Sequence, residues 1–435
     1  MEKTRGAGVV EAVEAACRRV MAFPGAPLSG LAAVLIKDGS VAWEGYFGAR
    51  RFDADGRRKL RPVDARTRWR VASISKPTVA LGIMRLVERG ILDLDGDISD
   101  YLGYPLRNPH FPGMAITARM LLGHTSSLRD ADFYFPPLGH ALRDLFEPGG
   151  RYYDGGRHFA GPDSLADRSP GAFYTYCNLG FGLLGSIIER AAGRRFDLYM
   201  QEEVFGPLGI DGSFNVNLLT DEGFSGLSPV YRKCPPDRED GWDAEGPWRP
   251  QVDDYGGMRP TLPVRLRNIA GERPSLEDYR LGENGSLFSP QGGMRIRALD
   301  LALIARLFIG GGEVETTRGS VRLLREESVR AMMTPGWERR SDGGNCEEEH
   351  SRVYATGIGL QRPTRPGGGP ALWGHRGNAY GFLGGMFVDR SERSGYVYMI
   401  GGTGADPDLN RDPKSGLSIW EDPLGGALEE ALSSI

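Results

Sequence analysis

The feature that most constrains the fold is a run of apolar residues at 77–87, inside the stretch RWRVASISKPTVALGIMRLVERG. Apolar side chains lie on nearly every side of the helix that this run predicts, so the helix must sit inside a core. Gly90 is a typical helix stop. The other elements of the chain must therefore enclose this helix, whatever polar groups stand at its head.

Two polar residues, Ser73 and Lys76, stand at that head, and lysine occurs only six times in the chain. Side chains three residues apart on a first helical turn share one face. A desolvated lysine near a positive helix N-terminus is expected to have a lowered pKa. Its neutral amine could then accept the proton of the serine hydroxyl and make the serine a nucleophile. By itself the pair is also compatible with a chance S-x-x-K and an exposed lysine.

The whole-chain composition excludes several classes of function. The 435 residues are 40% hydrophobic and 25% charged, with a net charge of −4, which is typical of a globular protein and predicts no nucleic-acid partner. No apolar run is long enough to cross a membrane, and Glu11 and Glu14 interrupt any secretory signal, so we expect a cytoplasmic protein. Four scattered cysteines and six histidines without metal-ligand spacing predict no disulfide framework, metal or cofactor.

The order of the predicted elements indicates an α+β fold. Two β-rich runs flank Asp38-Gly39, a hairpin signal, and further strands with glycine turns follow from about 370 to 404. Helices are expected at 10–20, in the middle of the chain and at the C-terminus. We predict one domain over 1–435, in which an antiparallel sheet with N- and C-terminal helices (about 1–70 and 295–435) joins a mostly helical part (about 71–294). The Pro- and Trp-rich segment at about 221–285 is expected to be a long ordered loop or insertion. Together with a second long loop at 130–169, it is predicted to form a lid that carries specificity. The aromatic residues that such a lid could bury are Phe133, Tyr134, Phe135, Tyr152, Tyr153, Phe159, Trp242, Trp248 and Tyr255.

Two further motifs carry groups suited to acyl transfer. Tyr176-Cys177-Asn178 comes just before a predicted helix, where a phenol could relay a proton and an amide could hold a substrate and orient the lysine. His375 and Gly377 lie on a strand that could present backbone N–H groups to an extended substrate or an oxyanion. Each motif alone is compatible with an ordinary structural role.

Taken in order, these motifs, with LLGHTSSL at 121–128 and SPQGGMRIRALDLA at 289–302, resemble the class C β-lactamase family of serine hydrolases. The resemblance runs from about residue 28 to the C-terminus and implies a β-lactamase/transpeptidase-like fold. It implies that Ser73 is the nucleophile, Lys76 its base and Tyr176 a general acid/base. It assigns substrate binding to Asn178, His375, Gly377 and Asn378, with the backbone N–H groups of Ser73 and Asn378 as the oxyanion hole. His124 is interpreted as packing behind the site.

The sequence departs from the family pattern at the third motif, which is His-Arg-Gly where a penicillin-recognising enzyme usually has Lys-Thr-Gly. A β-lactam carboxylate would lose a charged partner there, and Arg376 should point to the other face of the strand. We therefore predict an esterase that cleaves a small-molecule ester through an acyl-enzyme. A peptidase or amidase for D-residues, a β-lactamase, an acyltransferase and a catalytically silent binding protein remain alternatives. The oligomeric state stays open.

Overall fold

The computed structural model describes residues 2–264, 275–348, 352–369 and 371–434. Its main element is a nine-stranded sheet in the order β10-β11-β12-β13-β14-β15-β1-β2-β3, whose paired strands run antiparallel. Segments from both ends of the chain thus share one sheet, as predicted. The strands are β1 (Gly30–Lys37), β2 (Ser40–Phe52), β3 (Lys59–Pro62), β10 (Trp337–Glu338), β11 (Val353–Thr356), β12 (Gln361–Pro363), β13 (Trp373–Ala379), β14 (Phe382–Asp389) and β15 (Ser394–Ile400).

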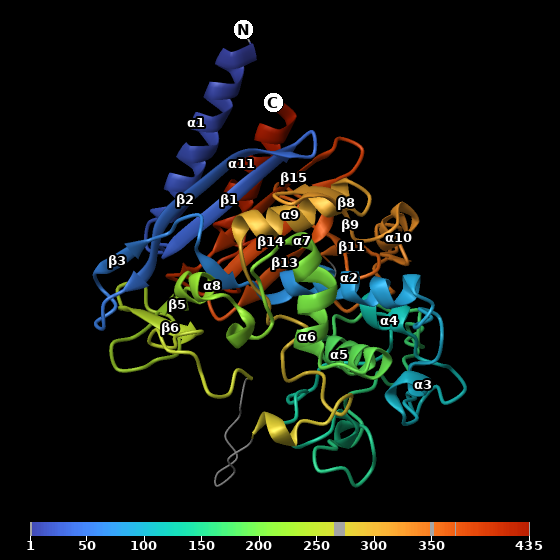
Figure 1. The fold of residues 1–435 in the computed structure, drawn as a ribbon. Coiled ribbons are helices and arrows are strands. Elements are labelled where there is room, and N and C mark those ends of the chain that lie inside the picture. The colour runs from blue at the N-terminus through green and yellow to red at the C-terminus, as the bar shows by residue number, and fades with distance from the viewer. Residues whose placement is uncertain (1, 265–274, 349–351, 370, 435) are drawn as a thin grey trace.

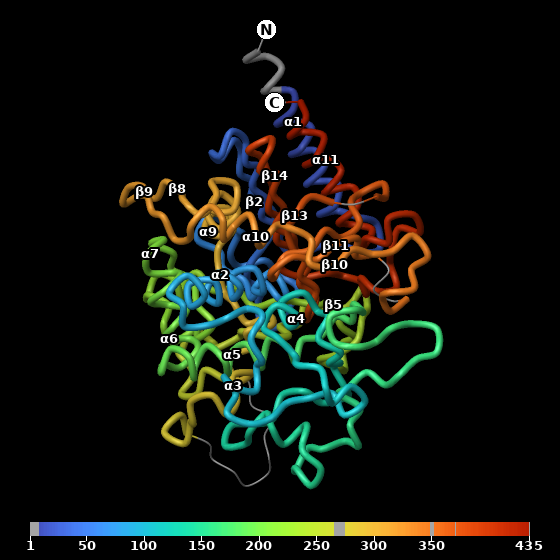
Figure 2. Tube along the Cα trace, turned by 90° about the vertical axis from the view of Figure 1, so that its right-hand side faces the viewer, coloured from blue at the N-terminus to red at the C-terminus, as the bar shows by residue number. Residues whose placement is uncertain are grey.

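Helices cover both faces of this sheet. The N-terminal α1 (Glu2–Met21) and the C-terminal α11 (Glu421–Ser434) lie side by side on one face, and α9 (Ala298–Ile309) packs on the other (Figures 1 and 2). Strand β1 shows why, because alternate side chains enter different cores. Leu31, Ala33 and Leu35 join the α1/α11 cluster, whereas Ala32, Val34 and Ile36 join the larger central core. A strand buried on both faces reads as a continuous apolar run, which is how GLAAVLI appears in the sequence.

The predicted buried helix is α2 (Ser75–Glu88), which packs against α5 (Asn178–Ala192) and lies in the central core. Both helices belong to the mostly helical part, below the sheet in Figure 1. Most of its other helices are a turn or two long. They are α3 (Ile98–Leu102), α4 (Ala118–Leu122), α6 (Phe196–Met200), α7 (Gly206–Leu208) and α8 (Asp221–Ser225), while α10 (Glu326–Met332) precedes β10.

The segment at 221–285 contains regular structure that its sequence did not predict. Strands β5 (Val230–Lys233) and β6 (Trp248–Val252) pair with each other, and β5 also pairs in parallel with β16 (Gly402–Thr403). Trp248 stacks on Phe52 at 5.5 Å between ring centroids, so this small sheet packs against β2. Part of the segment expected to be a loop therefore forms a small second sheet beside β2. Residues 265–274 lie outside the described residues.

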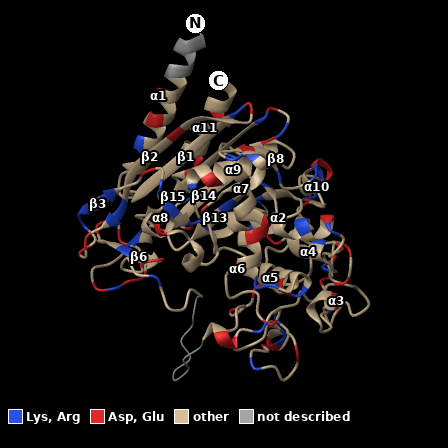
Figure 3. Ribbon diagram, viewed as in Figure 1, with Lys and Arg blue, Asp and Glu red and all other residues tan. Residues whose placement is uncertain are grey.

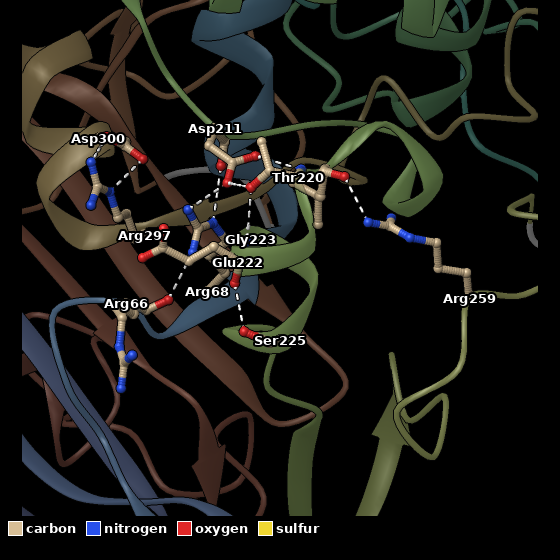
Figure 4. Close-up of polar contacts among 11 residues, drawn as sticks. Arg66, Arg68, Asp211, Thr220, Glu222, Gly223, Ser225, Arg259, Arg297 and Asp300 are labelled. Atoms are coloured by element: carbon tan, nitrogen blue, oxygen red, sulfur yellow. Dashed lines mark hydrogen bonds and ion pairs between the residues drawn. The ribbon is translucent and has the colours of Figure 1, made fainter.

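A polar network around Asp211 joins the strand that leads into α2 to the N-terminus of α8. Arg68, on β4 (Arg68–Arg70), donates to the carboxylate of Asp211 at 2.9 Å, and Thr220 at the start of α8 donates to that carboxylate at 2.6 Å (Figure 4). Strand β4 also pairs with β7 (Arg295–Arg297). The backbone before Ser73 is therefore held from two sides.

Charged groups of both signs are interspersed along the outer loops and strands (Figure 3). Within the part of the chain that the structure describes, no helix is both long enough and apolar enough to cross a membrane. A short hairpin of β8 (Glu313–Thr316) and β9 (Gly319–Arg322) completes the fold.

Candidate active site

The Ser73 backbone lies in a tight turn between β4 and α2. Residues 72–74 form a 3₁₀ turn, and Ala72 has a left-handed φ of 48°, which is costly for a residue with a side chain. The neighbouring Ser75 hydroxyl donates to the Ala72 carbonyl at 2.7 Å and accepts from the Met294 N–H at 3.0 Å. These contacts hold the strained turn and fix the direction of the Ser73 side chain.

The three residues predicted to be catalytic lie in direct contact. Ser73 Oγ is 3.0 Å from Lys76 Nζ and accepts a hydrogen bond from the Tyr176 hydroxyl at 2.7 Å. Tyr176 stands more than a hundred positions further along the chain, in the loop that leads into α5. A serine flanked by an amine and a phenol has a proton acceptor and a proton donor at once.

Lys76 is fully buried, and its hydrogen bonds define what it does. Besides Ser73, its Nζ contacts Asn178 Oδ1 at 2.9 Å and the Gln291 carbonyl oxygen at 2.8 Å. Both of these atoms can only accept, so they take the two hydrogens of a neutral amine, and its lone pair is left facing the serine hydroxyl. Burial lowers the pKa of Lys76 to about 7, although the negative charge of Asp130 opposes that shift. A large share of the molecules therefore has a neutral amine at neutral pH.

Asp130 organises this part of the site and was not predicted from the sequence. Its carboxylate accepts from the backbone N–H groups of Asn178 and Leu179, at 2.9 and 2.8 Å, and so caps the N-terminus of α5. It also accepts from Asn178 Nδ2 at 2.8 Å. Because the amide nitrogen faces a carboxylate, the amide oxygen must face Lys76. No local pattern signals this role, because the cap lies 48 positions before the helix that it serves.

His124 and Tyr176 pack together behind the serine. Their ring centroids are 4.4 Å apart, and His124 Nδ1 accepts from the Cys177 N–H at 3.1 Å. This is the supporting position interpreted for His124 from the sequence. Burial raises the pKa of the Tyr176 phenol, so the hydroxyl stays protonated and can donate to Ser73.

The third motif lies on β13, against the Ser73 turn. A Cβ atom on Gly377 would approach the Val71 carbonyl oxygen to 2.5 Å, so only glycine lets the strand pass this close. His375 is buried and donates its Nδ1–H to the Arg376 carbonyl at 2.6 Å, which leaves Nε2 without a partner among the described residues. Burial and the charge of Lys76 lower the pKa of His375 to about 3, so the imidazole is neutral. Arg376 points away, as predicted, and donates to the Thr364 carbonyl.

A cavity of about 150 Å³ opens at Ser73, and we call it the Ser73 cavity. Asn178 and Asn378 contribute to its wall, whereas His375 and Gly377 do not and lie behind the Ser73 turn. Sequence reasoning missed most of the other wall residues, although Tyr134 and Phe135 come from a loop expected to carry specificity. The lining consists of Arg70, Ala72, Ser73, Tyr134, Phe135, Pro136, Asn178, Ser286, Leu287, Ser289, Gln291, Gly292, Asn378, Ala379 and Tyr380.

Of the nine loop aromatics predicted to form a lid, Tyr134 and Phe135 line the Ser73 cavity and the other seven do not, including all three in the segment at 221–285. Trp242, Trp248 and Tyr255 are absent from the lining of the Ser73 cavity. Trp242 instead packs under Arg232, and Trp248 contacts Phe52. Among the described residues, no group of three or more His, Cys, Asp or Glu side chains is placed to hold a metal ion.

A helix-flanked antiparallel sheet whose buried helix presents a serine beside a lysine and a tyrosine defines the penicillin-binding-protein-like class of fold. Residues 24–419 match the family model described as Beta-lactamase. The chain therefore belongs to the beta-lactamase family, which includes serine hydrolases such as esterases and peptidases.

Relatives within this family differ in their reactions. The chain is 32% identical over 200 residues to Esterase EstB from Burkholderia gladioli, an alignment that covers 42% of this chain and 46% of the relative. It is 28% identical over 193 residues to the D-alanyl-D-alanine-carboxypeptidase/endopeptidase AmpH of Escherichia coli, covering 43% and 46%. The alignments thus span less than half of either relative. The solved D-amino acid amidase from Ochrobactrum anthropi SV3 shares the fold, with a TM-score of 0.61 and 18% identity over 98% of this chain and 99% of that one.

Proposed function

We propose that this protein is a serine hydrolase that cleaves a small ester through an acyl-enzyme on Ser73. The observation that carries the proposal is the pair of contacts on Ser73 Oγ, from Lys76 Nζ and from the Tyr176 hydroxyl, at the wall of a cavity. The similarity to Esterase EstB supports the choice of ester over amide.

The reaction proceeds in two halves. Neutral Lys76 takes the proton of Ser73 as the oxygen attacks the ester carbonyl, and the tetrahedral intermediate then expels the alcohol. Tyr176 passes a proton to the departing alkoxide and is reprotonated from the Lys76 ammonium. In the second half, water gives a proton to the same pair as its oxygen attacks the acyl-enzyme carbonyl. The pair returns that proton to Ser73 Oγ as the bond between Oγ and the acyl carbon breaks, which releases the acid and free Ser73.

The developing negative charge on the carbonyl oxygen needs donors that are already in place. The backbone N–H groups of Ser73 and Asn378 are our candidates. Both residues line the Ser73 cavity, and β13, which carries Asn378, packs against the turn that carries Ser73. Gly377 allows that contact, which gives the third motif a structural part in the same task.

Two features favour a small ester over a β-lactam. The third motif supplies no cation for a β-lactam carboxylate, since His375 is neutral and buried and Arg376 points away. The loss of one charge-assisted hydrogen bond weakens binding by about 10- to 150-fold. A cavity of about 150 Å³ is also small beside typical ligand pockets of roughly 300–1,000 Å³.

The test combines covalent labelling with a substrate panel. A fluorophosphonate probe should add once to the intact protein and fail to add to Ser73→Ala, and the absence of an adduct on the wild type would refute the acyl-enzyme. p-Nitrophenyl butyrate should then be cleaved with a kcat/KM at least about tenfold above that of nitrocefin and of a D-amino-acid anilide. A higher kcat/KM for nitrocefin would favour a β-lactamase over an esterase, and a higher value for the anilide would favour a peptidase or amidase for D-residues.

A further inference from the structure

A strained serine stands at the wall of the Ser73 cavity. Ser289 lines the cavity, has a left-handed φ of 52° and lies directly before Pro290. A positive φ is costly for a residue with a side chain, and a residue before proline favours the extended region. Glycine would adopt this φ without steric cost, so the backbone gives no reason for a side chain here. Strain of this kind is concentrated at functional sites.

The Ser289 hydroxyl has no partner among the described residues. The residue is 7% exposed, and its hydroxyl makes no hydrogen bond with any of them. The hydroxyl oxygen is not one of the polar atoms that these residues enclose completely, and Ser289 lines the Ser73 cavity, so the hydroxyl is open to that cavity. It therefore offers one donor and two acceptor lone pairs to a molecule bound there.

The two other serines of the cavity wall are engaged. Ser73 Oγ contacts its lysine and tyrosine partners, and Ser286 donates its hydroxyl proton to Asn284 Oδ1 at 2.5 Å. Within the described part of the chain, Ser289 is thus the serine of this wall whose hydroxyl is left for a ligand.

The backbone around Ser289 fixes the place of its hydroxyl. The Ser289 carbonyl accepts from the Gly292 and Gly293 N–H groups at 2.9 and 2.6 Å. A Cβ on Gly293 would lie 2.8 Å from the Ser289 Cβ, so only glycine fits there. Two residues after Ser289, the Gln291 carbonyl accepts from Lys76 Nζ at 2.8 Å. The loop that presents the hydroxyl is therefore part of the framework that holds the proposed base.

From these observations we propose that the substrate carries a hydroxyl group within a few bonds of the scissile ester, and that Ser289 binds it. A hydroxyl fits because it can both donate to and accept from the serine hydroxyl. A neutral group also loses less hydration than an ion on entering a cavity of about 150 Å³. The inference rests on the proposed esterase activity and narrows its substrate to hydroxy esters. Ser289 acts in specificity, and no proton of the reaction passes through it.

The experiment compares esters in which a hydroxyl group replaces a methyl group. Ethyl 3-hydroxybutanoate, each enantiomer separately, and ethyl 3-methylbutanoate test the acyl side, and 2-hydroxyethyl butanoate and propyl butanoate test the alcohol side. Acid release on a pH-stat gives kcat/KM, which is divided by the rate constant of hydroxide-catalysed hydrolysis to correct for intrinsic reactivity. We expect the hydroxy ester to be preferred by about 5- to 50-fold in at least one pair. A ratio below about fivefold in both pairs overturns the proposal.

Two substitutions at one position separate the hydroxyl from the strain. Ser289→Ala and Ser289→Gly both remove the hydroxyl, so both should bring the ratio close to one, while turnover of the methyl ester should change little. Ser289→Gly alone relieves the positive φ, so it should unfold at a higher temperature than Ser289→Ala. A ratio that is lost in Ser289→Gly and kept in Ser289→Ala would assign the preference to the backbone conformation and overturn the role of the hydroxyl.

Ser286→Ala is the matched control, because its hydroxyl belongs to the same wall but is already bound to Asn284. This variant should keep the ratio, which is insensitive to the fraction of folded enzyme, and an equal loss in Ser286→Ala would contradict a specific role of Ser289. A wild type that takes the fluorophosphonate label but shows no hydroxyl preference in either pair would retain the esterase and refute the inference. Absence of both the label and ester turnover would instead refute the proposed function.

Discussion

The two sides of the Ser73 cavity differ in how firmly their side chains are held. On the α2/α5 side, Lys76 is fully buried, and Lys76 and Asn178 have all their strong polar contacts satisfied by neighbours. On the loop side, Tyr134 and Phe135 come from an irregular segment and are half-buried. The contrast suggests that one side fixes the reaction and the other selects the substrate.

Physical chemistry explains this division. Proton transfer needs groups within hydrogen-bond reach and with tuned pKa values, which requires burial and rigid partners. Substrate choice depends on shape and charge at the cavity wall, and loops can change these without disturbing the core. Altering each side in turn should therefore affect different kinetic quantities.

Ser73→Ala should have the largest effect. We expect kcat for the best ester to fall by about 10⁴-fold or more, since loss of the nucleophile removes the acyl-enzyme pathway. Thermal unfolding should change little, because the Ser73 side chain is partly exposed and not part of the core. Activity close to wild type in the purified variant would exclude Ser73 as the nucleophile.

The neighbouring Ser75 provides a control of a different kind than its sequence predicted. From the sequence, Ser75 is predicted to face away from Ser73 and its alanine variant to keep activity; its hydroxyl does point elsewhere, but it is buried and bonds Ala72 and Met294. Ser75→Ala leaves the Met294 N–H unsatisfied, so stability should fall by about 1–3 kcal/mol. Its kcat should stay within about tenfold of wild type. Ser73→Ala should thus lose activity and keep stability, whereas Ser75→Ala should lose stability and keep activity.

Lys76 should control the pH dependence. Only its neutral form accepts the Ser73 proton, so kcat/KM for an uncharged ester should rise with pH and level off above a midpoint near the Lys76 pKa of about 7. Lys76→Arg should lower kcat by about 10²- to 10⁴-fold, since arginine keeps its proton. Stopped assays from pH 5 to 9 give the profile.

A midpoint near 7 is often assigned to histidine, and the variants can tell the two apart. The pKa of His375 is lowered to about 3, so His375→Gln should leave the midpoint in place. Tyr176→Phe combined with Lys76→Ala should be scarcely worse than the worse single variant, because residues that act as a unit are non-additive. A pH midpoint that disappears in His375→Gln would contradict the assignment to Lys76. Rate losses of the two single variants that multiply in the double variant would contradict a Lys76–Tyr176 unit.

The sequence predicted the buried side of the cavity better than the opposite side. The all-round apolar run at 77–87 required a buried helix, and the resemblance to the class C β-lactamase family pointed to Ser73, Lys76 and Tyr176, which lie together in the structure. Asp130 escaped prediction because its partners are brought to it by the fold. Arg70 escaped because the three-residue strand RWR shows no apolar alternation, although all three residues are buried in the structure.

Prediction failed most clearly in the segment at 221–285. Its two strands are four and five residues long and pair partly with residues 402–403, a contact that local periodicity cannot reveal. The aromatic residues there were expected to cover the cavity, but Trp248 is needed to pack the small sheet on Phe52. Composition indicated that these side chains would be buried and could not indicate where.

Asp130→Asn should have an intermediate effect with a distinctive direction. The negative charge of Asp130 raises the pKa of Lys76, so its removal should move the midpoint of the pH profile to lower pH. We also expect kcat to fall by about 10- to 100-fold, because the Asn178 amide loses the carboxylate that orients it. Asp132→Asn, two residues away with an exposed side chain, is the matched control and should change neither quantity. An unchanged midpoint in Asp130→Asn would show that its role is limited to capping α5.

The smallest effect is expected on the loop side of the cavity. Phe135 lines the Ser73 cavity, so Phe135→Ala should enlarge it and change the ratio of kcat/KM for p-nitrophenyl butyrate over acetate by about 5- to 10-fold, with kcat for acetate nearly unchanged. Trp242→Ala removes a larger ring from the segment at 221–285, outside the lining, and should alter that ratio less than twofold. An equal change of the ratio in both variants would contradict a specific role of Phe135 in substrate choice. If Phe135→Ala lowered kcat for acetate as strongly as Asp130→Asn lowers kcat, the loop side would also contribute to the reaction, and the division between the two sides would fail.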